Sequence, residues 1–305
     1  MSELPESRLV AAEAAVPELP EAPDLPEVAP RTLPRSVAAP ETAPIGIFDS
    51  GLGGLTVAHE IMSRLPGESI IYFGDTARVP YGPKSPDTVQ RYSREITAWL
   101  IEEGVKVVVV ACNTATAHAL GDLQRDFAIP VIGVVEPGAR AAARVSRSGH
   151  IGVIGTAGTI ASGAYVRAIH AAHDGATITA SACPLFVPLV EEGWLDDDAT
   201  RLIAHRYLDP LRAADVDTLV LGCTHYPLLK PLISETMGER VRLIDSAEET
   251  ASETCRVLTE IGLAADPASK PTHRFVASDA PDHFLRQGQR FLGAAIERVE
   301  KLTLG

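Results

Sequence analysis

Aromatic residues are scarce in this chain of 305 residues: Phe, Trp and Tyr make up only 5%, whereas hydrophobic residues as a class make up 46%. Val, Ala, Leu and Ile must therefore do most of the packing, as they do in parallel sheets covered by helices. The length allows one large hydrophobic core or two modest ones.

Basic residues are also few, with 27 Lys and Arg against 40 Asp and Glu, so the formal net charge is −13. This balance argues against nucleic acid or an anionic membrane surface as the main partner. The longest apolar run, around residues 107–111, is far too short to span a bilayer. A small-molecule partner remains compatible with the charge, because a local site can be positive in an acidic protein.

Cysteine is limited to four residues, Cys112, Cys183, Cys223 and Cys255. None forms a CxxC pair, so a zinc cluster of the finger or ribbon type is not expected and no metal site is predicted. The first residues lack the basic segment and apolar core of a signal peptide. Few cysteines and no export signal together predict a cytoplasmic protein.

Residues 1–44 differ in composition from the rest of the chain. They contain nine prolines, eight acidic and three basic residues, and no sustained period of 2 or 3.6. Such a segment buries too little apolar surface to offset its ordering entropy. We therefore predict a disordered extension over 1–44 with no catalytic role.

From residue 45 onward, short apolar runs alternate with helical patterns, which predicts βαβ units and a mainly parallel sheet. Nine strands are many for one sheet in about 260 residues, so two α/β domains are expected. The predicted strands are 45–48, 69–73, 105–111, 130–134, 150–154, 177–182, 218–221, 241–244 and 274–277. The clearest helical patterns are 55–65, 87–103, 115–127, 199–213 and 247–261.

A faint internal repeat supports two similar domains. Residues 45–50 resemble 151–156 at an offset of 106, and residues 109–114 resemble 220–225 at an offset of 111. In the second pair, each apolar strand ends in a small residue, a Cys, and then a hydroxyl or amide side chain. Two similar offsets in the same order favour duplicated halves.

The ends of the predicted strands carry the residues best suited to chemistry, because ligands bind beyond the carboxyl ends of parallel strands. After the first strand, Asp49 and Ser50 open a glycine-rich turn that can offer N–H groups to an anion. The pattern GxGxxG fails at Thr56, so a dinucleotide is not supported. The structural alternative is a tight turn with Asp49 or Ser50 as the helix N-cap.

Two of the four cysteines follow equivalent strands. Cys112 precedes Asn113 and Thr114 at a predicted helix N-terminus, a position that we expect to lower the pKa of its thiol toward neutrality. Cys223 precedes Thr224 and His225, and the imidazole can exchange a proton with the thiol.

Taken alone, each cysteine is better explained as an inert buried thiol, and His225 can be read as a satisfied, half-buried histidine. Their equivalent positions favour a functional pair. Cys183 and Cys255 lack such polar neighbours and are interpreted as structural. A turn-rich loop, 74–83, follows another strand and can close a site or simply connect two elements.

One thiol from each of two facing domains suits racemisation at an α-carbon. One group removes the proton, and the other delivers a proton to the opposite face. The developing carbanion needs hydrogen bonds and exclusion of water.

The residues resemble the glutamate racemases, cofactor-independent enzymes that make D-glutamate for the bacterial cell wall. The resemblance runs from about residue 44 to the C-terminus and includes several separate motifs in the same order. These are Asp49-Ser50-Gly51-Leu52-Gly53-Gly54-Leu55, Pro80-Tyr81-Gly82, Cys112-Asn113-Thr114-Ala115-Thr116, Pro188-Leu189-Val190-Glu191 and Gly222-Cys223-Thr224-His225-Tyr226-Pro227-Leu228-Leu229.

The resemblance implies that Cys112 and Cys223 act on opposite faces of glutamate. Asp49 would assist Cys112, and Glu191 and His225 would assist Cys223. It implies two doubly wound domains facing each other across the site: 45–136 with 246–305, and 137–245. Pyridoxal phosphate and other cofactors are not expected, and a homodimer is one open oligomeric state. The implied substrate-binding residues are Asp49, Ser50, Tyr81, Gly82, Asn113, Thr114, Thr224 and His225.

Three alternatives stay open at this point. Aspartate racemases look similar around the cysteines but typically carry an acidic residue where this chain has His225. A two-lobed amino-acid binding protein has no need of paired thiols. A zinc hydrolase with Cys and His ligands predicts a bound metal.

Overall fold

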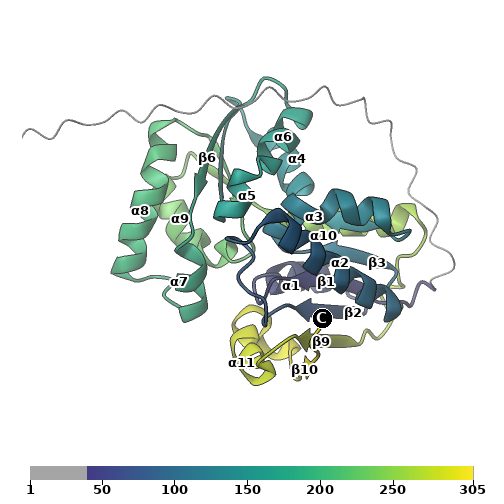
Figure 1. Cartoon of the computed structure of the whole chain (residues 1–305). Coiled ribbons are helices and arrows are strands. Elements are labelled where there is room, and N and C mark those ends of the chain that lie inside the picture. Colours follow the sequence, from purple (N-terminus) through teal and green to yellow (C-terminus); the bar gives the residue numbers. More distant parts are fainter. Residues whose placement is uncertain (1–39, 305) are drawn as a thin grey trace, which may run out of the picture. The chain divides into compact units, whose positions relative to one another are not determined.

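The computed structural model describes residues 40–304 and contains two α/β domains, each built on its own parallel sheet (Figure 1). The first sheet has the strand order β10-β9-β2-β1-β3-β4 and the second β6-β5-β7-β8, and every pairing is parallel. The strands are β1 Ile45–Asp49, β2 Ile70–Gly74, β3 Val107–Val110, β4 Val131–Gly133, β5 His150–Gly155, β6 Thr177–Ala182, β7 Thr218–Gly222, β8 Arg242–Asp245, β9 His273–Ala277 and β10 Glu300–Lys301.

The predicted repeat is confirmed by the topology, because the order β2-β1-β3-β4 recurs as β6-β5-β7-β8. In each domain the winding reverses at the first strand, β1 or β5, whose two neighbours lie on opposite sides. The carboxyl edge beside such a reversal is where open α/β sheets bind ligands. The loop after β3 carries Cys112 and the loop after β7 carries Cys223, so both cysteines lie beside a reversal point.

The helices cover the sheets, and the five that the sequence predicts are present with bounds within two residues of those expected. Within the described part of the chain, no helix is both long enough and apolar enough to cross a bilayer. The helices are α1 Leu55–Arg64, α2 Pro86–Glu102, α3 Asn113–Asp126, α4 Val135–Val145, α5 Ala157–Ala161, α6 Ala164–Ala172, α7 Phe186–Glu192, α8 Asp198–Ala213, α9 Lys230–Met237, α10 Ser246–Glu260 and α11 Pro281–Leu292, with 3₁₀ turns η1 Tyr226–Leu229 and η2 Gly293–Ala295.

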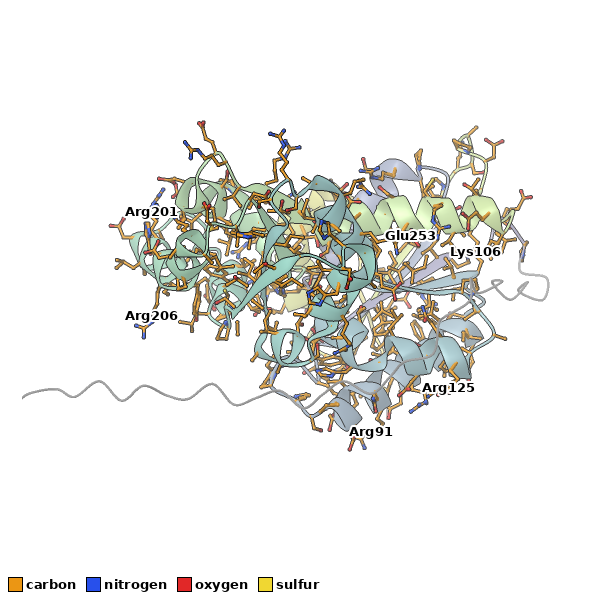
Figure 2. All side chains as sticks on the ribbon, turned by 90° about the horizontal axis from the view of Figure 1, so that it is seen from above. Arg91, Lys106, Arg125, Arg201, Arg206 and Glu253 are labelled. Atoms are coloured by element: carbon orange, nitrogen blue, oxygen red, sulfur yellow. The ribbon has the colours of Figure 1, made fainter. Side chains whose placement is uncertain are left out.

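The central strands β3 and β7 are buried on both faces, which explains why they are unbroken apolar runs in the sequence, whereas the edge strand β6 is partly exposed. In β3, Val107 and Val109 pack into one core while Val108 and Val110 pack into another on the opposite face. β7 divides its side chains in the same way between two further cores. By contrast, charged side chains such as Arg91, Arg125 and Arg206 are exposed and point outward (Figure 2).

The amino end of the first sheet is closed by a buried ion pair. Lys106 Nζ lies 2.6 Å from Glu68 Oε2 and donates to the carbonyl oxygens of Leu263 and Glu41. These partners offset the cost of desolvating both charges. Residues 40–44 thus contact the first domain, although the predicted disordered extension reached 44, and its remaining residues 1–39 lie outside the described residues.

The chain passes from the first sheet to the second between β4 and β5, and returns between β8 and β9. The expected crossing at Glu136-Pro137 lies in the first turn of α4, where a proline is tolerated because its missing N–H would have no intrahelical partner. The crossing at Asp245-Ser246 lies at the start of α10, where Asp245 is the N-cap and its Oδ1 accepts a hydrogen bond from the N–H of Ala247.

Candidate active site

A cavity of about 420 Å³ opens at the carboxyl ends of strands from both sheets, and every site residue predicted from the sequence lines it. These residues are Asp49, Ser50, Tyr81, Gly82, Cys112, Asn113, Thr114, Glu191, Cys223, Thr224 and His225. They come from five segments that are far apart in the chain, namely the ends of β1, β2, β3 and β7 with the residues that follow them, and helix α7. The strand-end argument therefore brought the correct loops together.

Cys112 is the N-cap residue of α3, with its Sγ 3.5 Å from the N–H of Ala115 and 3.7 Å from Ser50 Oγ. Burial and the nearby Asp49 carboxylate raise the pKa of the thiol to about 12. The expectation of a pKa near neutrality is therefore wrong. The N–H of Ala115 and the Ser50 hydroxyl do favour the thiolate, but removal of water from the sulfur outweighs them.

Asp49 ends β1 and is buried, and its Oδ2 accepts a hydrogen bond of 2.8 Å from the N–H of Gly51. Burial raises the pKa of this carboxyl group, while the positive His225 and the backbone N–H groups of the turn oppose the shift. Neither Asp49 nor Ser50 caps the following helix, since Gly54 is the N-cap of α1 and no side chain caps it. The glycine-rich turn instead directs Asp49 toward the cavity.

Cys223, His225 and Glu191 form a hydrogen-bonded chain. Cys223 Sγ lies 3.8 Å from His225 Nδ1, and His225 Nε2 lies 3.1 Å from Glu191 Oε1. Burial alone would lower the pKa of His225, but its bonds to Cys223 and Glu191 raise it to about 10. The imidazole is therefore protonated at neutral pH and is placed to exchange a proton with the thiol.

The glycine-rich turn after β1 and the first turn of α1, both in the first domain, hold the Cys223 loop of the second. Thr56 Oγ1 donates to the carbonyl oxygen of Thr224 at 3.1 Å. A Cβ on Gly53 would lie only 2.4 Å from Thr224 Oγ1 and 2.5 Å from His225 Nδ1. Only glycine permits this approach, which gives a physical reason for the glycine-rich turn.

The loop after β5 holds the Cys112 loop in the corresponding way. Thr156 Oγ1 lies 2.8 Å from Thr114 Oγ1, and Thr159 Oγ1 lies 3.3 Å from the same atom. Thr156 also lines the cavity, although we had not selected it from the sequence. The repeat carries the signal that could have found it, because Thr156 occupies the position of Ser50 in the second half.

The loop after β2 closes one side of the cavity through Tyr81 and Gly82. The Tyr81 hydroxyl donates to the Asp75 carboxylate, which also accepts from Arg78 and Ser278. The ring is 1% exposed, so its position is fixed by these bonds. The interpretation of this loop as a site-closing segment is therefore preferred to a simple connection.

The other two cysteines do not line the cavity. Cys183 is buried, which raises the pKa of its thiol to about 12, and its carbonyl oxygen accepts a hydrogen bond from Tyr226. Cys255 lies within α10. In the described residues, no group of three or more His, Cys, Asp or Glu side chains has the arrangement to hold a metal ion.

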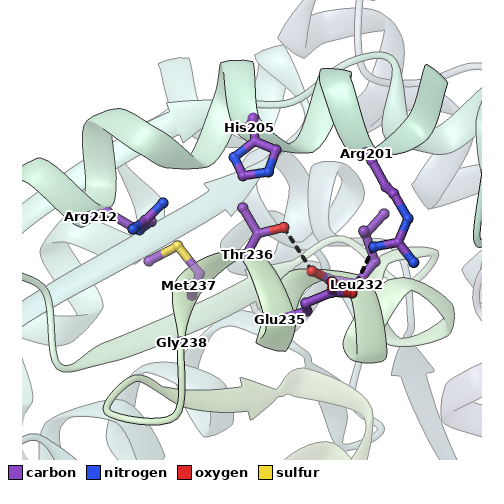
Figure 3. Close-up of a pocket in the computed structure, with 8 residues that line it drawn as sticks. All are labelled: Arg201, His205, Arg212, Leu232, Glu235, Thr236, Met237 and Gly238. Carbon is purple, nitrogen blue, oxygen red and sulfur yellow. Dashed lines mark hydrogen bonds and ion pairs between the residues drawn. The ribbon is translucent and has the colours of Figure 1, made fainter. Parts of the chain in front are cut away.

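A separate surface pocket of about 260 Å³ lies between α8 and α9 (Figure 3). Its basic side chains are already paired: Arg201 with Glu235 at 2.7 Å, and Arg212 with Asp209 at 3.2 Å. It contains none of the predicted site residues. The cavity between the two cysteine loops is thus the better candidate for chemistry.

Comparison with known proteins shows the family to which this chain belongs. The family model for Asp/Glu/hydantoin racemases matches residues 55–254. A glutamate racemase from Geobacter metallireducens is 56% identical over 85% of this chain and 96% of its own length. Its agreement over nearly the whole relative shows that the shared region includes both domains.

Solved structures give the same result. Glutamate racemase RacE1 from Bacillus anthracis is 44% identical with a TM-score of 0.82, covering 87% of this chain and 98% of its own. The enzyme from Francisella tularensis, solved with D-glutamate, is 37% identical with a TM-score of 0.80, covering 86% and 98%. The chain therefore belongs to the Asp/Glu/hydantoin racemase family and is an amino-acid racemase of the glutamate racemase group.

Proposed function

We propose that this chain interconverts L- and D-glutamate by moving a proton between Cα and the thiols of Cys112 and Cys223. The observation that carries the proposal is that both cysteines, from equivalent loops of the two domains, line one cavity. A substrate held between the loops would have a sulfur on either face of its α-carbon. Glutamate is favoured as substrate because the Francisella relative was solved with D-glutamate.

In one direction, the thiolate of one cysteine takes the Cα proton, and the electron pair of the C–H bond remains on the substrate as a carbanion. The other cysteine donates its thiol proton to the opposite face, which leaves it as a thiolate. The reverse direction exchanges these roles, so atoms and charge balance without an added reactant. The raised pKa of Cys112 supports this chemistry, because a more basic thiolate is a stronger base toward a weakly acidic C–H bond.

Different groups assist the two cysteines in this scheme. Asp49 acts on Cys112 through its charge, and Ser50 lies within 3.7 Å of the sulfur. His225 relays protons to Cys223 while Glu191 orients the imidazole, an arrangement that corresponds to a nucleophile, base and orienting carboxylate in other enzymes. We assign the substrate carboxylates to the N–H and O–H groups of Ser50, Gly82, Asn113, Thr114 and Thr224, with Tyr81 as a wall.

We further propose that residues 45–136 and 246–305 move as one domain against residues 137–245, with hinges at the two crossings. Such a motion would admit substrate and then exclude water from the carbanion. By its resemblance to the glutamate racemases, the enzyme would work without a cofactor in the cytoplasm and supply D-glutamate for peptidoglycan. Growth of a D-glutamate-requiring bacterium on expression of this chain, without added D-glutamate, would test that role.

The substrate assignment is tested by circular dichroism of the purified full chain with L-glutamate, D-glutamate and L-aspartate. Loss of ellipticity with both glutamate enantiomers, and a kcat/KM for aspartate at least about 100-fold lower, is expected, because a site built to bind one side chain rejects an analogue that leaves its polar groups unpaired. Faster turnover of aspartate would overturn the proposal.

A further inference from the structure

Asn113 has a side-chain amide that is only half satisfied. It is 3% exposed and lines the cavity, yet its Nδ2 has no hydrogen-bond partner among the described residues. A buried donor without a partner is destabilising, because it has lost its hydrogen bonds to water and has gained none in return. The unpaired Nδ2 of Asn113 beside Cys112 is explained if the substrate supplies the missing acceptor.

The other end of this amide is held by Tyr165, the second residue of α6 in the second domain. The Tyr165 hydroxyl donates to Asn113 Oδ1 at 2.8 Å. An amide whose oxygen is fixed in this way must present its N–H₂ group on the opposite side. Burial raises the pKa of Tyr165, so the hydroxyl retains the proton that it donates.

Tyr165 also contacts the Cys223 loop. A Cβ on Gly222, the residue before Cys223, would lie 2.9 Å from Tyr165 Cε2, so the ring rests against this backbone. The side chain is 2% exposed. One tyrosine therefore touches both cysteine loops without lining the cavity itself.

We propose that Tyr165 is a positioning residue that fixes the orientation of the Asn113 amide, so that Nδ2 donates a hydrogen bond to a carboxylate of the substrate. The inference rests on the proposed racemisation of glutamate. It implies that Tyr165 and Asn113 are energetically coupled, because Tyr165 affects substrate binding through Asn113 and not through the overall stability of the fold. An amide without this bond could turn over and present its oxygen to the substrate. The amide oxygen and the substrate carboxylate would then repel each other.

A double-mutant cycle on the full chain tests this coupling, with the variants Tyr165→Phe, Asn113→Ala and both together. Tyr165→Phe is expected to lower kcat/KM about tenfold, mainly by raising KM for both enantiomers, as the loss of one organised hydrogen bond predicts. In the Asn113→Ala background the same substitution should change kcat/KM less than twofold. Equal effects in the two backgrounds, or wild-type kinetics in Tyr165→Phe, would overturn the inference.

Tyr226→Phe is the matched control, because Tyr226 is equally buried in the same domain and donates to the carbonyl oxygen of Cys183. Its effect, whatever its size, should be the same with and without Asn113→Ala. Coupling of the same size as for Tyr165 would show that any buried tyrosine couples to Asn113, and would contradict a specific role.

A second measurement does not depend on the substrate. The side-chain amide resonances of Asn113, identified by their loss in Asn113→Ala, should shift and broaden in Tyr165→Phe and remain unchanged in Tyr226→Phe. If the wild-type chain turned over no glutamate, the proposed function would fail, yet this spectrum would still decide whether Tyr165 orients Asn113. Sharp, unshifted resonances in Tyr165→Phe would refute the positioning role.

Discussion

The two cysteine loops occupy equivalent places in a duplicated fold but have different surroundings. Cys112 caps the 14-residue helix α3 and lies near a carboxylate and a hydroxyl, whereas Cys223 is followed by a 3₁₀ turn and faces a protonated histidine. Burial and the nearby Asp49 carboxylate raise the pKa of Cys112, so this thiol is a weaker acid than a thiol in water. The two halves therefore share the position of the thiol but differ in the groups around it that can give or take a proton.

Removing either thiol is the most severe test of this comparison. Cys112→Ala and Cys223→Ala should each lower racemisation by roughly 10³-fold or more, because each removes one general acid–base group. In deuterium oxide, each variant should exchange the Cα proton of at most one enantiomer, and the two variants should select opposite enantiomers. Cys183→Ala and Cys255→Ala serve as controls with near wild-type activity; exchange of both enantiomers in either active-site variant would contradict the two-thiol mechanism.

Changing the helpers should have a smaller effect and should separate the two sides. His225→Gln and Asp49→Asn are each expected to lower kcat/KM about 100-fold. The equilibrium constant is one, so kcat/KM must fall equally for both enantiomers, and the difference must be sought in isotope effects. With Cα-deuterated substrate, His225→Gln should increase the kinetic isotope effect for the enantiomer that Cys223 deprotonates. Asp49→Asn should increase the isotope effect for the enantiomer that Cys112 deprotonates. The same enantiomer responding in both variants would contradict separate roles.

The pH dependence of stability gives a third comparison. The pKa of His225 is raised in the folded state, from about 6.5 to about 10, so its stabilising contribution is complete below pH 6.5 and is lost as pH rises through 10. Urea titrations would measure the free energy of unfolding of the wild type and of His225→Gln. The excess stability of the wild type should decline as pH rises from 6.5 to 10. A difference that grows with pH would show that the imidazole is neutral in the folded protein.

The smallest effects are expected where each domain holds the cysteine loop of the other. Thr56→Val removes the bond to the Thr224 carbonyl, and Thr156→Val removes the bond to Thr114. Each should lower kcat/KM about two- to tenfold, the range for one hydrogen bond. Thr56→Val should change the isotope effect of the same enantiomer as His225→Gln, and Thr156→Val that of the same enantiomer as Asp49→Asn. If both threonine variants affected the same enantiomer, these bonds would stabilise the whole site equally.

The sequence predicted those parts of the site whose signals are local. Cys112 and Cys223 each follow an apolar strand and precede polar residues, so their place at the carboxyl edge could be inferred from a few neighbours. The pKa of Cys112 could not be predicted, because the helix N-terminus is a local feature whereas burial depends on segments that are far apart in the chain. Tyr165 was missed for the same reason: an aromatic residue on an apolar helix face carries no sign of the distant amide that it holds.

The glycine contact at Gly53 and the threonine contacts at Thr56 and Thr156 mean that each half completes the other half's reactive loop. On the proposed chemistry, the two cysteine loops meet opposite faces of the substrate, so that interchanging the two halves would also interchange those faces. A rotation that leaves the α-carboxylate in place also interchanges the amino group and the side chain. A perfectly symmetric binding site could not distinguish the amino group from the side chain. The differences between the two loops therefore allow the site to bind the amino acid in one orientation while accepting both enantiomers.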